Sequence, residues 1–284
     1  MKKIIIAAHK PYAFPHDDLY LPLQVGAAGR KEILDLGTVY LKDGRAFGET
    51  IMRDDMDENI SGRNWGYSEL TGLYWAWKNL RDAETIGLVH YRRYFTVKSA
   101  LFRHGHEPLR CILTEGELSA LLLQYDILVP RKRIYAVETL YSHYDHTFDG
   151  YQLDVVFDLI RERYPEYEQY IHPVSRRRWG YMFNMMILSR RELDDYCTWL
   201  FDLLFALEER LSEEGYLEGL SDFEKRLFGR VSEILFNIWV EKQRHDGRRI
   251  GEVPVLHVEP EDWPKKVKAF LAAKLGKAKY GESF

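Results

Sequence analysis

The chain contains 284 residues, of which 46% are hydrophobic and 30% are charged. This composition is typical of a folded globular protein and excludes an intrinsically disordered chain. The formal net charge of −4 disfavours a general nucleic-acid-binding protein. The two cysteines, Cys111 and Cys197, lack the spacing of a disulfide framework or a zinc site. No apolar run approaches the roughly 20 residues of a membrane span, and the N-terminal run is too short for a secretion signal. We therefore expect a cytoplasmic protein.

The first predicted strand is the β-branched apolar run at residues 3–8, which leads into His9 and Lys10. In an open α/β sheet, ligands bind beyond the carboxyl ends of the strands, so this polar loop is predicted to lie at a nucleotide. A purely structural histidine is the alternative. Gly26 and Ala27 follow in a stretch of small residues that would let another backbone or a base approach closely. The spacing is that of neither a dinucleotide fingerprint nor a P-loop.

An acidic stretch at residues 54–64 precedes a predicted helix at residues 67–80. Its carboxylates do not follow the calcium-loop pattern, and we interpret the stretch as a loop that caps the helix. Apolar residues at three- and four-residue spacing predict one buried helix face. Tyr74 and Lys78 are four residues apart and share a neighbouring face. Because this helix runs directly into the next strand, both elements are predicted to reach one ligand.

The strongest functional pattern is the stretch at residues 85–95. Ile86, Leu88 and Val89 predict a short buried strand, which ends abruptly in His90, Tyr91, Arg92 and Arg93. Arginine presents a fixed fork of donors that matches phosphate oxygens in pairs, so this strand end predicts a phosphate-binding site. The alternative is a solvated strand end that carries a surface salt bridge.

The middle of the chain has clear structural signals and one ambiguous cluster. Thr114 and Glu117 have the spacing of a capping box at the start of a helix. A short strand is predicted at residues 125–130 and an amphipathic helix at residues 152–163. Between them, two histidines and Asp145 lie close together at residues 143–146. Metal ligation is one interpretation of this cluster, and contacts with an acceptor or plain surface polarity are the preferred ones.

A second informative stretch is a predicted strand at residues 185–188, with Asn184 at its entrance. An amide at this position can orient a hydroxyl-rich ligand. A long helix at residues 191–210 follows. Gly229 predicts a break, which would place Glu233 in the first turn of a later helix, where a carboxylate also complements the helix dipole. A final strand is predicted at residues 253–258. The basic amphipathic tail is predicted either to contact a membrane surface or a partner, or to pack as a terminal helix.

The order of these motifs resembles a family of bacterial capsular and exopolysaccharide glycosyltransferases long catalogued as a domain of unknown function. The resemblance extends from about residue 4 to about residue 240. It rests on Asn59-Ile60-Ser61, Tyr67-Ser68-Glu69-Leu70-Thr71-Gly72-Leu73-Tyr74-Trp75-Ala76-Trp77-Lys78-Asn79, His90-Tyr91-Arg92-Arg93-Tyr94-Phe95 and Phe183-Asn184-Met185. It implies a GT-A-like transferase with UDP-galactofuranose or UDP-galactose as the donor. His90-Tyr91-Arg92-Arg93 stands where the general GT-A plan has a metal-binding Asp-x-Asp.

We therefore expect an α/β protein with a central mixed sheet flanked by helices, a GT-A-like glycosyltransferase domain at residues 1–258 and a tail at residues 259–284. By analogy with GT-A enzymes, Glu233 is the first candidate for the catalytic base and Asp145 the second. The residues expected to bind the donor are His9, Lys10, Gly26, Ala27, Tyr74, Lys78, His90, Tyr91, Arg92, Arg93 and Asn184.

Fixed Arg and His donors can stabilise a departing nucleotide diphosphate in place of a metal ion. We expect no cofactor and an inverting reaction. The alternative is Mg²⁺ or Mn²⁺ held by Asp54, Asp55 and Asp57. The expected partners are a UDP-sugar and a glycan or lipid-linked oligosaccharide acceptor, and no nucleic acid is expected. The expected location is the cytoplasm, with peripheral association at the inner face of the cell membrane as an alternative. A non-catalytic nucleotide-sugar or carbohydrate-binding protein is the competing class. A phosphoryl-transfer enzyme is disfavoured because P-loop and kinase motifs are missing from the sequence.

Overall fold

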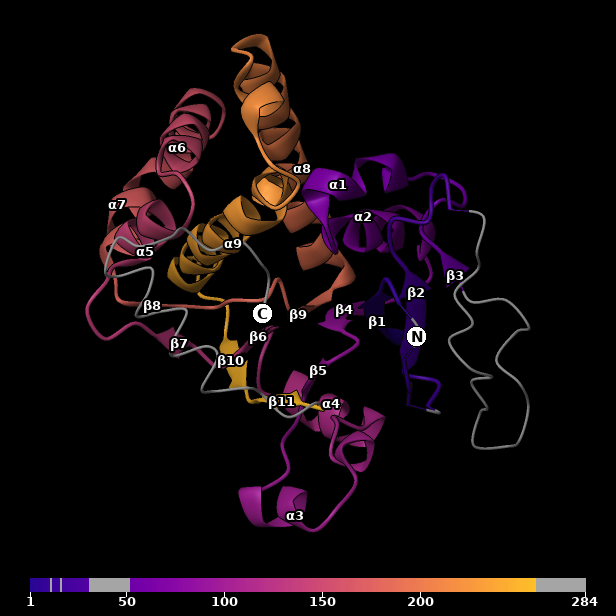
Figure 1. Ribbon diagram of the computed structural model, residues 1–284. Helices are drawn as coiled ribbons and strands as arrows, with labels where there is room; N and C mark the ends of the chain where they lie inside the picture. Colours follow the sequence, from indigo (N-terminus) through magenta and orange to yellow (C-terminus); the bar gives the residue numbers. More distant parts are fainter. Residues whose placement is uncertain (11, 16, 31–51, 259–284) are drawn as a thin grey trace.

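The computed structural model describes residues 1–10, 12–15, 17–30 and 52–258 (Figure 1). The tail predicted at residues 259–284 lies outside the described residues. The elements in chain order are β1 (Lys2–Ala8), β2 (Tyr20–Gln24), β3 (Met52–Arg53), η1 (Ser61–Arg63), α1 (Asn64–Tyr67), α2 (Leu70–Asn79), β4 (Thr85–His90), β5 (Arg93–Phe95), α3 (Ala100–His104), η2 (Pro108–Arg110), α4 (Glu115–Leu122), β6 (Ile127–Pro130), β7 (Arg133–Ile134), α5 (Leu140–Thr147), α6 (Tyr151–Arg163), η3 (Pro165–Tyr167), α7 (Glu168–Arg176), β8 (Trp179–Gly180), β9 (Met186–Ser189), α8 (Arg190–Glu213), η4 (Tyr216–Gly219), η5 (Glu224–Arg226), α9 (Leu227–His245), β10 (Ile250–Val253) and β11 (Val255–His257).

A mixed central sheet organises the chain, as predicted. Its strands follow the order β10-β6-β9-β4-β1-β2-β3, and β5 and β11 extend it beside β4. β1 pairs in parallel with β2 and β4, whereas β9 runs antiparallel between β4 and β6. β3 is parallel to β2, and β10 is parallel to β6. The carboxyl ends of β1, β2, β3, β4, β6 and β10 therefore share one edge of the sheet, and β9 begins at that edge.

The sheet has an apolar core on each of its faces because successive side chains of a strand point to opposite faces. Ile5 and Ala7 of β1 pack with the core under α2, α8 and α9, whereas Ile4 and Ile6 pack with the core beside α4. Figure 1 shows α8 and α9 on one side of the sheet and α3 and α4 on the other. Fully burying one such aliphatic or aromatic side chain stabilises the fold by roughly 1.5–3 kcal/mol.

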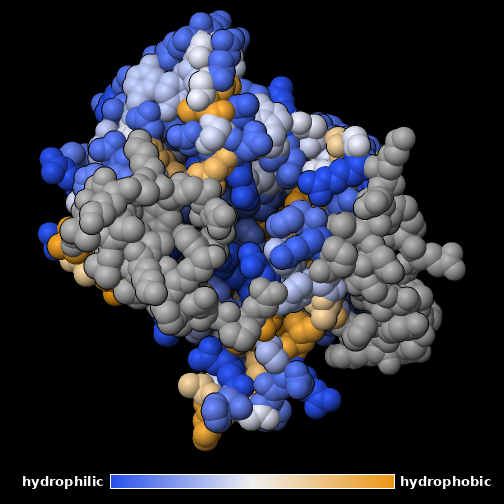
Figure 2. Space-filling model, in the orientation of Figure 1, coloured by the Kyte–Doolittle hydropathy of each residue, from blue (hydrophilic) through white to orange (hydrophobic). Residues whose placement is uncertain are grey.

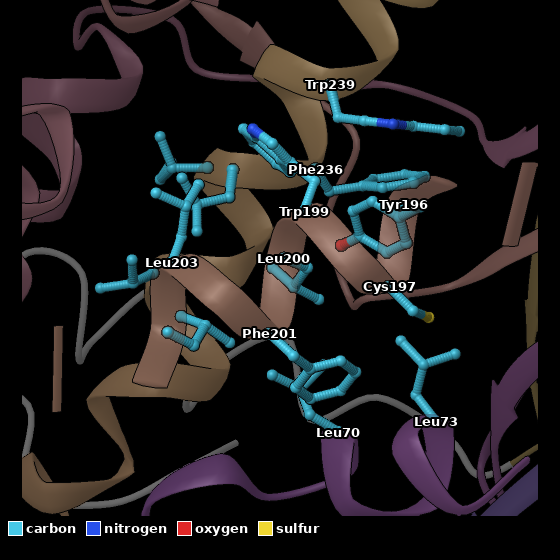
Figure 3. Close-up of a cluster of buried hydrophobic side chains, with 14 of the residues drawn as sticks. Leu70, Leu73, Tyr196, Cys197, Trp199, Leu200, Phe201, Leu203, Phe236 and Trp239 are labelled. Carbon is cyan, nitrogen blue, oxygen red and sulfur yellow. The ribbon is translucent and has the colours of Figure 1, made fainter. Parts of the chain in front are cut away.

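The larger core is built mainly by the two longest helices. Leu193, Cys197, Leu200, Leu204 and Leu207, the predicted inner stripe of α8, are all fully buried. Figure 3 shows side chains of α8 and α9 meeting those of α2 in one cluster. None of the helices in the described ranges is long and apolar enough to cross a membrane.

Most predicted elements are confirmed, and two are each divided in the structure. The capping box is present, with Thr114 accepting from the Glu117 backbone N–H and Glu117 accepting from that of Thr114. The helix predicted at residues 67–80 is interrupted because Ser68 has φ of 52° and turns the chain between α1 and α2. The last predicted strand is divided into β10 and β11 by Pro254, which cannot donate to a sheet ladder.

The prediction that Gly229 breaks a helix is wrong. α9 runs without interruption from Leu227 to His245, which places Glu233 in its second turn rather than its first. A Cβ atom at Gly229 would lie 3.3 Å from Cβ of Ser68 and 3.4 Å from the backbone oxygen of Tyr67. Glycine at this position therefore allows α9 to pack closely against the corner between α1 and α2, without ending the helix.

Candidate active site

The candidate site lies at the edge where the carboxyl ends of six strands meet. The segments that follow β1, β2 and β4 carry basic side chains to this edge, and the turn that precedes β9 arrives between β4 and β6. The start of α2 and the first turns of α9 also reach it. Figure 2 shows a central recess with hydrophilic walls on this face of the molecule. The fold thus concentrates polar side chains at the edge where α/β proteins bind ligands.

A strained two-residue turn forms the centre of the site. Phe183 and Asn184 have φ values of 76° and 49°, a region that non-glycine residues rarely adopt. The backbone N–H of Phe183 donates to Oε1 of Glu233 at 2.6 Å, and its carbonyl oxygen lies 2.5 Å from Nε2 of His90. Such strain persists only where the surrounding structure holds it in place, and it is common at functional sites.

Asn184 holds the same turn through its side chain and is almost completely buried. Its Nδ2 donates to Oε1 of Glu69 and to the carbonyl oxygen of Gly229, both at 2.8 Å. Its Oδ1 accepts from Oγ of Ser232 at 2.9 Å. The amide therefore joins the start of α2 to α9. Because its donors and acceptor are engaged within the protein, Asn184 is placed to support the site rather than to orient a hydroxyl-rich ligand directly.

Glu233 combines a fixed position with altered acidity. Burial and the neighbouring carboxylate of Glu69 raise its pKa to about 7, against the opposing effects of the Phe183 N–H, Arg133 and Arg93. A carboxylate with a pKa near the operating pH is suited to accept a proton in one step and lose it in the next. Among the residues predicted from sequence to be catalytic, Glu233 is the one that the structure places in the site.

His90 lies in the site, but it does not provide the cation that the sequence predicted. Burial lowers its pKa, and the arginines that follow it lower it further, against an opposing effect of Glu69. The ring is therefore neutral near pH 7. Since the carbonyl oxygen of Phe183 can only accept, Nε2 of His90 must carry the proton. His90 and Glu233 thus hold the Phe183–Asn184 turn through the carbonyl oxygen and the N–H of Phe183 respectively.

Positive charge gathers around His9, at the same edge of the sheet. Partial desolvation and four nearby cations, Arg226, Lys10, Arg30 and Arg92, lower the pKa of His9, although its side chain is exposed. His9 is therefore neutral at physiological pH. The four cations come from segments after β1, β2 and β4 and from the residue before α9. Such a convergence of cations predicts an anionic ligand with more than one charge.

The ring of Tyr91 contacts three members of this group, namely Lys10, Arg92 and His9. Nζ of Lys10 lies 5.6 Å from its ring centroid and the Arg92 guanidinium carbon 5.1 Å from it. The His9 ring packs edge-on against Tyr91 at 5.3 Å. Arg93 turns toward the other part of the site, with its guanidinium carbon 4.6 Å from the ring centroid of Phe183. Arg92 and Arg93 therefore face different groups although they are consecutive.

The glycine loop after β2 is closed by a buried carboxylate. The N–H groups of Gly26 and Ala27 donate to the two oxygens of Asp54 at 2.8 and 2.9 Å. A Cβ atom at Gly26, where φ is 64°, would lie 2.3 Å from Oδ1 of Asn64. The small residues thus allow a close approach, as predicted, but the group that approaches is Asn64. The amides of Gly26 and Ala27 are already occupied and do not face a phosphate.

The acidic loop is held together by its own contacts. Asp54 also accepts from the hydroxyl groups of Ser61 and Thr71, each at 2.5 Å, so it joins this loop to α2. Asp55 forms a salt bridge with Arg53 at 2.7 Å. Within the described parts of the chain, no group of three or more His, Cys, Asp and Glu side chains is arranged to hold a metal ion.

The structure does not bring three predicted residues to the site. Tyr74 packs edge-on against Phe201 of α8 at 5.0 Å, and Lys78 pairs with Glu58 at 3.1 Å. α2 begins at the site and runs toward the start of β4, so Lys78 in its last turn lies toward the opposite edge of the sheet. Asp145 is exposed and accepts the N–H of Gly150 at 2.9 Å, which closes the turn before α6.

Comparison with known proteins shows which family the chain belongs to. A family model described as "Domain of unknown function (DUF4422)" matches residues 3–244. The chain belongs to this family. It is also similar to a solved structure, the WbbM bifunctional glycosyltransferase in its apo form, with 27% sequence identity and a TM-score of 0.75. The match covers 92% of this chain and 46% of that protein, so the chain spans less than half of its length. No curated protein matches the chain.

This member of the family contains site residues that sequence reasoning missed. Glu69 belongs to the Tyr67–Asn79 motif and is the residue directly before α2. Its position at the start of this helix is the sequence signal that could have indicated a site residue. Arg226 precedes α9 in a Lys-Arg pair that reads as ordinary surface charge. Nothing in the local sequence indicates that Arg226 would reach His9, because that proximity depends on the corner between α1 and α2.

Proposed function

We propose that this protein is a GT-A-like glycosyltransferase that moves a hexosyl unit from a UDP-sugar to a glycan acceptor. The observation that carries this proposal is that Glu233, a carboxylate with a pKa of about 7, and a cluster of cations lie at the same sheet edge. Similarity to a glycosyltransferase of known structure supports the same conclusion. The transferase domain would occupy residues 1–258.

In the proposed reaction, an acceptor hydroxyl oxygen forms a bond with the anomeric carbon of the donor sugar. The bond from that carbon to the β-phosphate oxygen breaks, and its electron pair leaves with UDP. The hydroxyl proton passes to the carboxylate of Glu233, which the Phe183 N–H and α9 hold in place. A base on the face opposite the departing UDP gives inversion at the anomeric carbon.

The cations would stabilise the departing diphosphate. Lys10 and Arg92 around Tyr91, together with Arg30 and Arg226, provide fixed positive charge where the leaving group develops negative charge. Donors of this kind can carry out a function that a divalent cation performs in other enzymes. We therefore propose that transfer proceeds without a bound metal ion.

Galactofuranose and galactose are the sugars that the resemblance to surface-polysaccharide transferases implies. In that setting, the acceptor would be a growing glycan or a lipid-linked oligosaccharide. The protein would then act at the inner face of the cell membrane through peripheral association.

The test is release of UDP from UDP-galactofuranose and from UDP-galactose, with and without p-nitrophenyl glycosides as acceptors, before and after exhaustive chelation with EDTA. We expect turnover with one donor and activity within about two-fold after chelation. Binding of UDP without turnover would instead identify a non-catalytic nucleotide-sugar-binding protein. Loss of activity that Mn²⁺ restores would overturn the metal-independent mechanism and leave the transferase assignment standing.

A further inference from the structure

A pocket of about 150 Å³ has Glu233 among its lining residues. Tyr135, Tyr144 and Phe148 give it aromatic walls, and its charged or polar side chains include Arg133, His143, Arg230 and Glu233. Tyr135 follows β7, and the other two aromatic residues and His143 belong to α5 or follow it directly. The pocket is therefore built by the part of the chain that follows β6, whereas three of the four cations, Lys10, Arg30 and Arg92, follow β1, β2 and β4.

His143 is held in a defined orientation. Its Nδ1 lies 2.7 Å from Oε2 of Glu138, and since a carboxylate accepts, Nδ1 carries a proton. Burial lowers the pKa of His143 against the opposing effect of Glu138, and Arg133 and His146 lower it further. The ring is therefore neutral near pH 7. Nε2 then has a lone pair and can accept a hydrogen bond from a hydroxyl group.

The walls around this histidine are rigid. The guanidinium of Arg230 lies 4.1 Å from the ring centroids of both Phe148 and Phe223, and it donates to the carbonyl oxygen of Phe223 at 2.5 Å. Tyr135 packs against the His143 ring with a centroid distance of 4.4 Å. A preformed pocket with apolar faces and a few fixed polar groups is typical of small-molecule sites.

We propose that this pocket is the acceptor subsite, that it binds one pyranose ring, and that His143 accepts a hydrogen bond from a hydroxyl group of that sugar. This inference rests on the proposed transferase function. A cavity of about 150 Å³ holds a six-membered carbon ring, as engineered protein cavities show, and the pocket is open, so substituents and further sugars can extend outward. The aromatic walls suit the apolar face of a sugar ring.

The position of the pocket favours the acceptor over the donor. In the order of the sheet, Lys10, Arg30 and Arg92 follow strands on one side of β9, and Arg133, Tyr135 and the pocket residues of α5 follow β6 on the other side. Glu233 accepts a hydrogen bond from the Phe183 N–H, in the turn that leads into β9 between these two groups of strands. A hydroxyl group in the pocket would therefore meet the base, while the diphosphate departs toward the cations.

The chain offers a matched control for the test. His146 also bonds to Glu138, with Nδ1 2.9 Å from Oε1, but its side chain is 66% exposed and it is not among the pocket residues. His143→Ala and His146→Ala therefore remove equivalent contacts with one carboxylate, and only the first changes the pocket. Tyr135→Leu is a second pocket variant, which removes an aromatic wall and keeps an apolar side chain.

The experiment measures the acceptor KM with p-nitrophenyl galactopyranoside, glucopyranoside and N-acetylglucosaminide, and UDP affinity by calorimetry as a check on the fold and the donor site. We expect His143→Ala and Tyr135→Leu each to raise the acceptor KM about tenfold or more, the size of one or two lost contacts. UDP affinity should stay within about two-fold. His146→Ala should leave both quantities unchanged.

Three results would overturn the subsite. One is an unchanged acceptor KM in both pocket variants, and another is an equal effect of His143→Ala and His146→Ala. The third is release of UDP by the wild-type protein with none of the three pyranosides used as acceptor. Failure of the wild-type protein to release UDP from either donor is a different result, because it overturns the proposed function itself.

Discussion

Two regions of the site differ in the kind of side chains that build them. The carboxylate side, comprising Glu69, Glu233, His90 and the Phe183–Asn184 turn, is fixed by hydrogen bonds that join α2, β4 and α9. The cation side, comprising Lys10, Arg30, Arg92 and Arg226, consists of long side chains around His9 and Tyr91, and Lys10 and Arg30 are exposed.

The difference follows from the task proposed for each region. Proton transfer requires a base held within hydrogen-bond reach of one atom, so the carboxylate side must be organised before the substrate arrives. A diphosphate carries several oxygens and is attracted over a longer distance, so several cations in one region can share its charge. The strained Phe183–Asn184 turn lies on the organised side, where the surrounding contacts can maintain it.

The largest expected effect comes from Glu233→Gln. The amide oxygen can still accept the Phe183 N–H, but the side chain cannot take a proton, so turnover should fall roughly 10²–10⁴-fold. The measurement is the rate of UDP release in the presence of acceptor. Asp145→Asn is the control from the same sequence analysis, and it should leave the rate unchanged. Equal losses in the two variants would contradict the assignment of the base.

The next largest effect concerns the arginines after β4. Arg92→Ala and Arg93→Ala should each lower kcat/KM for the UDP-sugar by about tenfold or more. Arg92→Ala removes charge-assisted contacts with the diphosphate, worth roughly 1.5–3 kcal/mol, and Arg93→Ala removes the cation that packs on Phe183 and lowers the pKa of Glu233. Arg92→Lys should restore only part of the loss, since lysine lacks the planar fork. Arg191→Ala, on the exposed face of α8, is the control for a simple loss of charge. Unchanged kinetics in both arginine variants would show that this strand end is structural.

A smaller effect is expected on stability. The pKa of Glu233 is raised in the folded protein, to about 7. In the unfolded chain the pKa of Glu233 is about 4.5. As the pH rises from 4.5 through 7, Glu233 ionises in the unfolded chain before it ionises in the folded protein, so the folded state loses stability. Glu233→Gln should therefore stabilise the protein at pH 8 by about 1–2 kcal/mol and have little effect at pH 4.5. Chemical denaturation at the two pH values tests this, and a larger gain at pH 4.5 would contradict it.

The smallest effect is a shift in the pH profile. Turnover should decline as the pH falls through about 7, because Glu233 accepts the proton only when ionised. Glu69 contributes to the raised pKa, so Glu69→Gln should move this acidic limb to lower pH by less than about one unit. In this variant the amide oxygen of residue 69 can still accept the hydrogen bond from Nδ2 of Asn184, so the turn stays in place. Glu209→Gln, an exposed change on α8, should leave the limb in place. A shift to higher pH in the Glu69 variant would show that another group titrates.

Sequence reasoning located the strands well, because β1, β4, β6 and β9 are short apolar runs with abrupt polar ends. It therefore predicted the sheet edge and placed His9, Arg92 and Arg93 there. It could not predict that β9 runs antiparallel between β4 and β6, which brings Asn184 and Glu233 together. That arrangement depends on pairing between distant segments.

Residue type was a weaker guide to role. His90 and Asn184 reach the site as predicted, but their polar atoms are used to hold a turn. Gly229 predicts a helix break because glycine has a low helix propensity. Its actual role is close packing against Ser68, which depends on the three-dimensional fold. Tyr74 and Lys78 share a helix face, as predicted, but that face packs against α8 and Glu58 rather than a ligand.

The division of the site into two regions is tested most directly by calorimetric titration of UDP into the Glu233→Gln and Arg92→Ala variants. If the cation side binds the diphosphate and the carboxylate side removes the proton, Glu233→Gln should bind UDP within about two-fold of the wild-type affinity, and Arg92→Ala should bind it about tenfold or more weakly. Wild-type affinity in Arg92→Ala together with weakened binding in Glu233→Gln would contradict this division.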